Sequence, residues 1–172
     1  DFYGFDIRKE AKTLGLLGSW YTDKSNRNDI VSVTVVHDDN NVYFKIETKD
    51  DITAYAGGEN WMNVLIKTKS SSASSSFNGY DFILNRSPET GKASVEKSTG
   101  GWNWNKAGRA DMKIEGNKMM ITVPLSMLGL TKNEFRFEFK VADNVTDYTD
   151  IMDYYVSGDS APIGRLNYTY GY

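Results

Sequence analysis

The sequence predicts an all-β fold, an antiparallel β-sandwich with short helical turns. Several short segments alternate apolar and polar residues, which is the pattern of strands that bury one face. Clusters of Gly, Asn, Asp and Ser separate these segments, and such residues favour turns. With 172 residues, the chain fits a single domain over residues 1–172 that buries about 70% of its unfolded surface.

Residues 1–28 do not follow this alternating pattern. Their one helix-like stretch, residues 7–17, has poor apolar spacing and is weakened by Gly15 and Gly18. A helix with interrupted apolar spacing has no continuous face to bury. We therefore expect residues 1–28 to form an irregular N-terminal segment that packs on the sandwich.

The remaining chain supplies the expected strands, most of them recognised by their alternation. They cover, in order, residues 31–35, 42–46, 62–66, 80–84, 93–97, 112–114, 119–123, 135–141 and 166–172. The turn HDDNN at 37–41 should join the first two strands into a hairpin, and Gly116 with Asn117 should form the tight turn of a second hairpin. Pro124 ends that hairpin and can begin a short helical turn through Leu128.

The strands at 62–66 and 80–84 organise the predicted sandwich. They flank a serine-rich run at 70–76, which is almost free of apolar residues and is expected to be a long exposed loop. Their alternation gives each strand one dry face that the rest of the chain must cover. Further on, residues 93–97 are expected to form a short edge strand. Residues 98–108, rich in Gly and Asn, are expected to form an exposed loop.

Composition limits the classes of function. The formal charge of −3 and the dispersed Lys and Arg residues argue against a nucleic-acid partner. The lack of cysteine excludes disulfides, thiolate metal sites and a cysteine nucleophile. No run reaches the roughly 20 apolar residues of a membrane span, and no signal peptide is recognised. Because the chain begins at Asp1 without methionine, we expect it to be a piece of a longer protein.

Catalytic groups are sparse in the sequence. The single histidine, His37, lies in the HDDNN turn, and the sequence shows neither a nucleophile nor an orienting acid for it. We therefore expect a protein that is not an enzyme and that requires no cofactor. Two carboxylates that meet in space could still make a glycoside hydrolase, and 23 acidic residues leave that alternative open.

Tryptophans form the first candidate site. Trp102 and Trp104 lie two residues apart, so they would project from one face of an extended segment, beside Asn103 and Asn105. Flat indole rings match the apolar C–H face of a sugar, and amides match its hydroxyl groups. Trp61, at the start of the strand at 62–66, belongs to the same group of candidates. The alternative is that these rings close one end of the core.

Acidic and amide residues form the second candidate site. Carboxylate and amide oxygens are the ligands that calcium prefers. The spacing of these residues fits no EF-hand loop, so a solvated acidic face is the alternative to a structural calcium site. The candidates are Asp143, Asn144, Asp147 and Asp150, with Asp153 close by.

Several segments resemble a known family. They are ENWMNVLIKTK, GYDFILNR, KIEGNKMMITVPLSMLGL, FEFKVADN and DIMDYYVSGDSAPIGRLNY, in this order. From residue 29 to residue 172 the chain is similar to the carbohydrate-binding modules of family 9, within the DOMON-like sandwiches of bacterial polysaccharide-degrading proteins. The resemblance implies an Ig-like β-sandwich that binds sugar without catalysis, is secreted or held at a bacterial cell surface, and is covalently attached to glycoside hydrolase domains.

The resemblance also implies a pair of aromatic rings that clamp a sugar. The matching positions are Trp61 and either Tyr154 or Tyr155, and Asn85 and Arg86 are candidates for hydrogen bonds to sugar hydroxyl groups. Some members of the family bind calcium. This chain departs from its apparent relatives before GYDF. Relatives often carry acidic residues at the end of the preceding strand and then a TGW-like loop, whereas this chain has Lys67, Lys69, a serine run and Phe77.

Two other functions stay open at this point. The fold could be kept as a structural spacer or docking module without a sugar site, and burial of all three candidate tryptophans would favour that function. DOMON relatives bind haem through Met and His ligands, but the lone His37 lies in a predicted turn.

Overall fold

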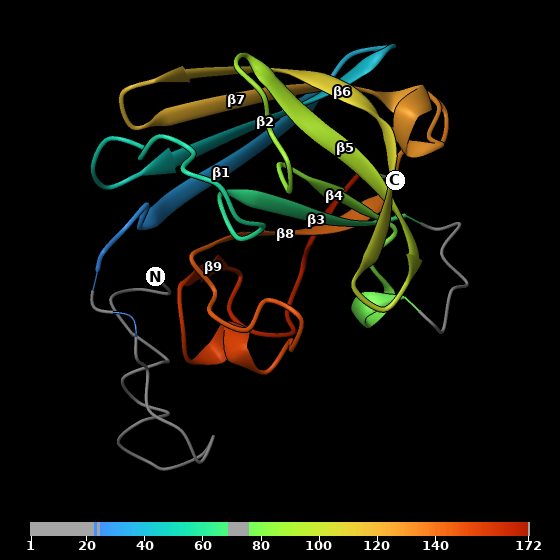
Figure 1. Ribbon diagram of the computed structural model, residues 1–172. Coiled ribbons are helices and arrows are strands. Elements are labelled where there is room, and N and C mark those ends of the chain that lie inside the picture. Colours follow the sequence, from blue (N-terminus) through green and yellow to red (C-terminus); the bar gives the residue numbers. More distant parts are fainter. Residues whose placement is uncertain (1–22, 24, 69–75, 172) are drawn as a thin grey trace.

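The computed structural model describes residues 23, 25–68 and 76–171, and antiparallel strands dominate it (Figure 1). The strands are β1 (Ile30–His37), β2 (Asn41–Thr48), β3 (Asn63–Thr68), β4 (Phe82–Leu84), β5 (Lys92–Gly100), β6 (Asn103–Glu115), β7 (Lys118–Pro124), β8 (Phe137–Asp143), β9 (Asp159–Ala161) and β10 (Tyr168–Tyr170). Single 3-10 turns occur at η1 (Phe77–Gly79), η2 (Leu125–Leu128) and η3 (Asp153–Tyr155). The predicted all-β class and the helical turn after Pro124 are confirmed.

The strands form one continuous sheet that curls until its two ends meet. Their order is β1-β2-β7-β6-β5-β4-β3-β8-β10, and β9 also pairs with β8. At the meeting point, the amide of Ile30 donates to the carboxylate of Asp159 (2.6 Å). His37 Nδ1 lies 2.8 Å from the hydroxyl of Tyr170. Side chains therefore join the two ends of the sheet, and the sheet is nearly closed.

The contact between His37 and Tyr170 gives a first test of this closure. Replacing Tyr170 with phenylalanine keeps the ring but removes the hydroxyl that meets His37. We expect the free energy of unfolding to fall by about 0.5–1 kcal/mol, because one partly exposed hydrogen bond is lost. Urea denaturation measures the change, and Tyr168→Phe on the same short strand is the control. An equal loss in both variants would contradict a specific role for the contact.

The main core lies inside the curled sheet. It collects the inward side chains of β2, β7 and β8, together with those of β3, β4 and β5. Phe44 of β2 meets Phe137 and Phe139 of β8, with ring centroids 5.9 and 5.6 Å apart. The core therefore joins strands that are far apart in the sheet order.

A second apolar cluster covers the other face of β3, β4 and β8. Leu65, Ile83 and Ala142 supply the sheet side. The covering side consists of η1, the tip of the β5–β6 hairpin and the segment around η3, which lies below β8 in Figure 1. These central strands are therefore buried on both faces, and the expectation of a single dry face is wrong for them.

The structure also corrects the assignment of residues 93–108. β5 pairs with both β4 and β6, so it is no edge strand, and residues 103–108 belong to β6 rather than to an exposed loop. The hairpin turns at Gly100 and Gly101, whose φ angles of 125° and 50° suit glycine. Most of residues 1–28 and of the serine-rich run lie outside the described residues. In the described part of the chain, no helix has the length and apolar character needed to cross a membrane.

Candidate functional site

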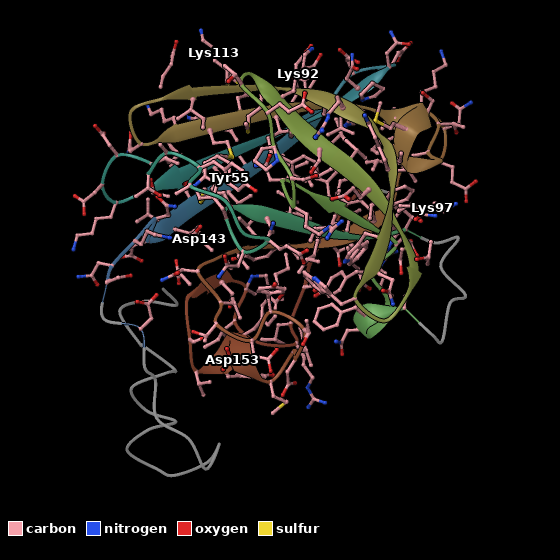
Figure 2. All side chains as sticks on the ribbon, viewed as in Figure 1. Tyr55, Lys92, Lys97, Lys113, Asp143 and Asp153 are labelled. Atoms are coloured by element: carbon pink, nitrogen blue, oxygen red, sulfur yellow. The ribbon has the colours of Figure 1, made fainter. Side chains whose placement is uncertain are left out.

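An open groove of about 590 Å³ lies beside β6 of the curled sheet. The loop between β2 and β3 forms one wall, the turn before β5 forms another, and β6 contributes the rest. We call it the Tyr55 groove, after the exposed ring that Figure 2 labels on the loop between β2 and β3. Its apolar lining consists mainly of Ile52, Tyr55, Trp61, Pro88, Met112 and Ile114.

Two aromatic rings pack against each other at this groove. The ring centroids of Tyr55 and Trp61 are 5.6 Å apart with an interplanar angle of 56°. Trp61 is only 3% exposed and donates its indole N–H to the carbonyl of Thr53 (3.0 Å), whereas Tyr55 is 37% exposed. The Tyr55 hydroxyl donates to the carbonyl of Gly58 (2.9 Å). Both rings are therefore held by internal hydrogen bonds, and Tyr55 is the one with a large exposed surface.

The loop between β2 and β3, which we call the groove loop, is held in its first part by hydrogen bonds from its backbone amides. The amide of Ile52 donates to the carbonyl of Gly116 (3.0 Å), and the amide of Thr53 donates to the side chain of Asn28 (2.8 Å). Asn28 is buried and returns a hydrogen bond to the Thr53 hydroxyl (3.0 Å). A loop fixed in this way loses little conformational entropy when a ligand binds.

Polar groups stand among the apolar lining of the groove. Thr53, Glu89 and Thr90 belong to the lining. Glu89 forms an ion pair with Arg109, so the charge of its carboxylate is largely compensated. The groove thus offers hydroxyl and carboxylate oxygens next to an aromatic ring. This combination suits a ligand with both apolar and hydroxyl-bearing faces.

Four further residues form what we call the Glu59 cluster: Glu59, Arg86, Glu96 and Trp102. Glu59 accepts hydrogen bonds from Arg86 Nη1 and from Trp102 Nε1, both at 2.7 Å. Arg86 also donates to both oxygens of Glu96 (2.7 and 3.0 Å). The hydrogen bond to Glu96 is the largest contribution that raises the pKa of Arg86 above its ordinary value. Glu59 and Glu96 were not predicted from the sequence as site residues.

The structure does not bring the predicted aromatic clamp together. Trp61 belongs to the main core, whereas Tyr154 is 3% exposed and belongs to the second cluster. Burial raises the pKa of Tyr154, whose hydroxyl donates to the carbonyl of Tyr148 (3.1 Å). The hydroxyl of Tyr155 accepts a hydrogen bond from the amide of Arg165 (3.1 Å), and its ring packs directly against Gly164. Tyr154 and Tyr155 therefore stabilise the C-terminal segment.

The other predicted sugar contacts differ in their exposure. Asn85 is fully buried and donates to the carbonyl of Met62 (3.2 Å), so its side chain is closed to a ligand. Trp104 is 8% exposed within the second cluster, and Trp102 is half-buried beside it, with ring centroids 5.5 Å apart. Asn103 and Asn105 are exposed on β6. Of the three candidate tryptophans, only Trp102 retains appreciable exposure.

The predicted calcium ligands serve other contacts. Asp143 is fully buried and binds Arg27 through both oxygens (2.8 and 3.1 Å). Asp147 and Asp150 each accept hydrogen bonds from residues two positions later, and the side-chain nitrogen of Asn144 donates to Asp23 (3.0 Å). Figure 2 shows Asp143 beside the sheet and Asp153 at a distance from it, in the η3 segment. Among the described residues, no group of three or more His, Asp or Glu side chains is placed so that it could hold a metal ion.

His37 is not among the residues that line the Tyr55 groove. Its ring packs against Phe135, with centroids 4.0 Å apart, at the meeting point of the two sheet ends. Neither the described residues nor the comparisons with known proteins point to catalysis. Comparison of the chain with protein-family models, with curated proteins and with solved structures finds no match.

Proposed function

We propose that this chain is a noncatalytic carbohydrate-binding module with an Ig-like sandwich, and that it binds a polysaccharide in the Tyr55 groove. In this role it would target an attached or partner glycoside hydrolase to its substrate, outside a bacterial cell or at its surface. The observation that carries the proposal is the groove itself, with a 37% exposed tyrosine ring beside hydroxyl and carboxylate oxygens. Its volume of about 590 Å³ lies within the usual range for small-molecule sites.

The chemistry of the groove matches that of a sugar ring. The exposed face of Tyr55 can stack on the C–H face of a sugar, and its hydroxyl remains bonded to Gly58. Thr90 and Glu89 can then meet the hydroxyl groups at the edge of the sugar. Because Trp61 lies against Tyr55, sugar binding should change tryptophan fluorescence.

Replacing Tyr55 with alanine tests the proposed site. We expect glycan affinity to fall about 10- to 100-fold, because the stacking surface is lost. Titrations of glucans, xylans and their oligosaccharides, followed by tryptophan fluorescence and calorimetry, measure the change. The control is Tyr168→Ala, which removes a tyrosine of similar exposure (43%, against 37% for Tyr55) from β10.

Two outcomes would contradict the proposal. Binding that is equally weakened by Tyr55→Ala and Tyr168→Ala would place the site elsewhere. The absence of a response to any glycan would favour the second candidate, a structural spacer or docking module without a sugar site. The burial of Trp61 (3% exposed) and Trp104 (8% exposed) is the observation that favours this second candidate.

A further inference from the structure

The middle of the groove loop contains two glycines in an unusual conformation. Gly57 and Gly58 have φ angles of 98° and 86°, a region that side-chain-bearing residues rarely adopt. Glycine pairs lose much conformational freedom on folding, so this part of the loop needs contacts that hold it. The carbonyl of Gly58 is the group that accepts the hydrogen bond from Tyr55. The position of Gly58 therefore affects the position of the Tyr55 ring.

Glu59 follows this glycine pair directly and is tied to two other parts of the chain. Its two carboxylate oxygens accept from Arg86, which follows β4, and from Trp102, at the tip of the β5–β6 hairpin. Arg86 is itself held by the buried carboxylate of Glu96, whose side chain is 7% exposed. Trp102 is held by ring contacts with Phe77 and Tyr148, with centroids 4.9 and 5.2 Å apart. Both partners of Glu59 are therefore also held in position by contacts with other residues.

Charge gives this connection more strength than an ordinary loop contact. Hydrogen bonds between a carboxylate and a guanidinium are charge-assisted and stronger than those between neutral groups. The side chain of Glu59 is 35% exposed, so solvent weakens but does not remove the effect. The other oxygen accepts from the indole N–H of Trp102, and the geometry of that bond depends on the position of the hairpin tip.

We propose that Glu59 is a positioning residue for the Tyr55 groove. By joining the glycine pair to Arg86 and Trp102, Glu59 holds the Gly58 carbonyl, and through it the Tyr55 ring, in the orientation that faces the groove. The effect on ligand affinity rests on the proposed sugar-binding function. The effect on the Tyr55 ring does not, since it concerns the protein without ligand.

The variant Glu59→Gln tests this inference. Arg86 and Trp102 bind different oxygens of Glu59, and an amide replaces one of these oxygens with an NH2 group that only donates, so one of the two hydrogen bonds must break. NMR signals of the Tyr55 ring, shifted by the nearby Trp61 ring, should move toward unstructured values in the protein without ligand. Glycan affinity should fall about fivefold, as expected for the loss of one charge-assisted hydrogen bond that positions the ring.

Two further variants keep the test specific. Trp102→Phe keeps an aromatic ring in the second cluster but removes the N–H that meets Glu59, and it should shift the Tyr55 signals in the same direction. Glu138→Gln is the control, because Glu138 is also an ion-paired, partly exposed carboxylate, 3.8 Å from Lys67. The control should leave both the Tyr55 signals and the affinity unchanged.

The outcomes separate this inference from the proposed function. Unchanged Tyr55 signals in Glu59→Gln would overturn the inference, whatever the affinity. Shifted signals with unchanged glycan affinity would overturn the link between Glu59 and the ligand and leave the sugar site standing. Shifted signals in a protein whose wild type binds no glycan would support the positioning of Tyr55 by Glu59 and overturn the proposed function.

Discussion

Replacing Trp61 with alanine is expected to lower the free energy of unfolding by about 3–5 kcal/mol. Trp61 is 3% exposed, belongs to the main core and has its indole N–H satisfied by the carbonyl of Thr53. Removal of the indole leaves a cavity that the neighbouring strands can fill only in part. Urea denaturation of the variant and the wild-type protein at the same pH measures the change.

Trp102→Ala is the matched control for this experiment. Trp102 is half-buried and lies at the tip of a hairpin, so its removal should cost less stability than that of Trp61. If Trp61→Ala cost no more than Trp102→Ala, the burial of Trp61 in the core would be contradicted. The expected loss of stability also limits what Trp61→Ala can show about glycan binding. A loss of glycan affinity in Trp61→Ala would reflect a disturbed core as well as a lost contact, which makes Tyr55 the better position for testing the groove.

Strands with one exposed face were predictable from the sequence. The hairpin of β1 and β2 alternates because the outer face of these strands is open to solvent, and β2 shows strict alternation of buried and half-buried residues. Strands β3 and β4 were located correctly, although both of their faces are buried. Asp81, just before β4, looks like an outward polar residue in the sequence. In the structure it is 7% exposed and accepts hydrogen bonds from the amide and the hydroxyl of Thr68 (2.7 and 2.6 Å).

The hairpin of β5 and β6 was missed because its local composition is that of a loop. The glycines and asparagines between residues 98 and 108 have low strand propensity. The ladder with β5 and the burial of Trp104 against the second cluster hold the start of β6 in place. These are contacts between distant segments, and such contacts override propensity. The end of β6 and the turn to β7 were predictable, since Gly116 supplies a φ angle of 58° where the turn requires it.

The candidate site was predictable only in part. Trp61 was identified, and it does lie at the groove, but as a buried ring rather than an exposed platform. Tyr55 was missed because a single tyrosine in a polar loop gives no pattern, and its exposure depends on how the loop folds. The bond between Glu59 and Trp102 joins residues that are 43 positions apart. No local spacing in the sequence indicates a contact of this kind.

Replacing Lys140 with methionine is expected to stabilise the protein below about pH 7, by an amount on the order of a few kcal/mol. Lys140 lies on β8, is fully buried, and donates from Nζ to the carbonyl of Pro162. Burial lowers the pKa of Lys140 to about 7. Glu138, two residues earlier on the same face of β8, is paired with Lys67 instead (3.8 Å). A methionine of similar length fills the same space without the cost of burying a charge.

The pH dependence of this effect distinguishes a buried charge from simple repacking. Between pH 7 and the ordinary lysine pKa of about 10.4, the unfolded chain binds a proton at Lys140 and the folded chain does not, so wild-type stability rises with pH in this window. Below pH 7 both states bind the proton, and the full cost of burying the charge is present. The advantage of Lys140→Met should therefore be greatest near pH 6 and shrink as the pH rises toward 9. Denaturation midpoints across this range measure it, and a difference between the two proteins that does not change with pH would show that Lys140 keeps an ordinary pKa in the folded state.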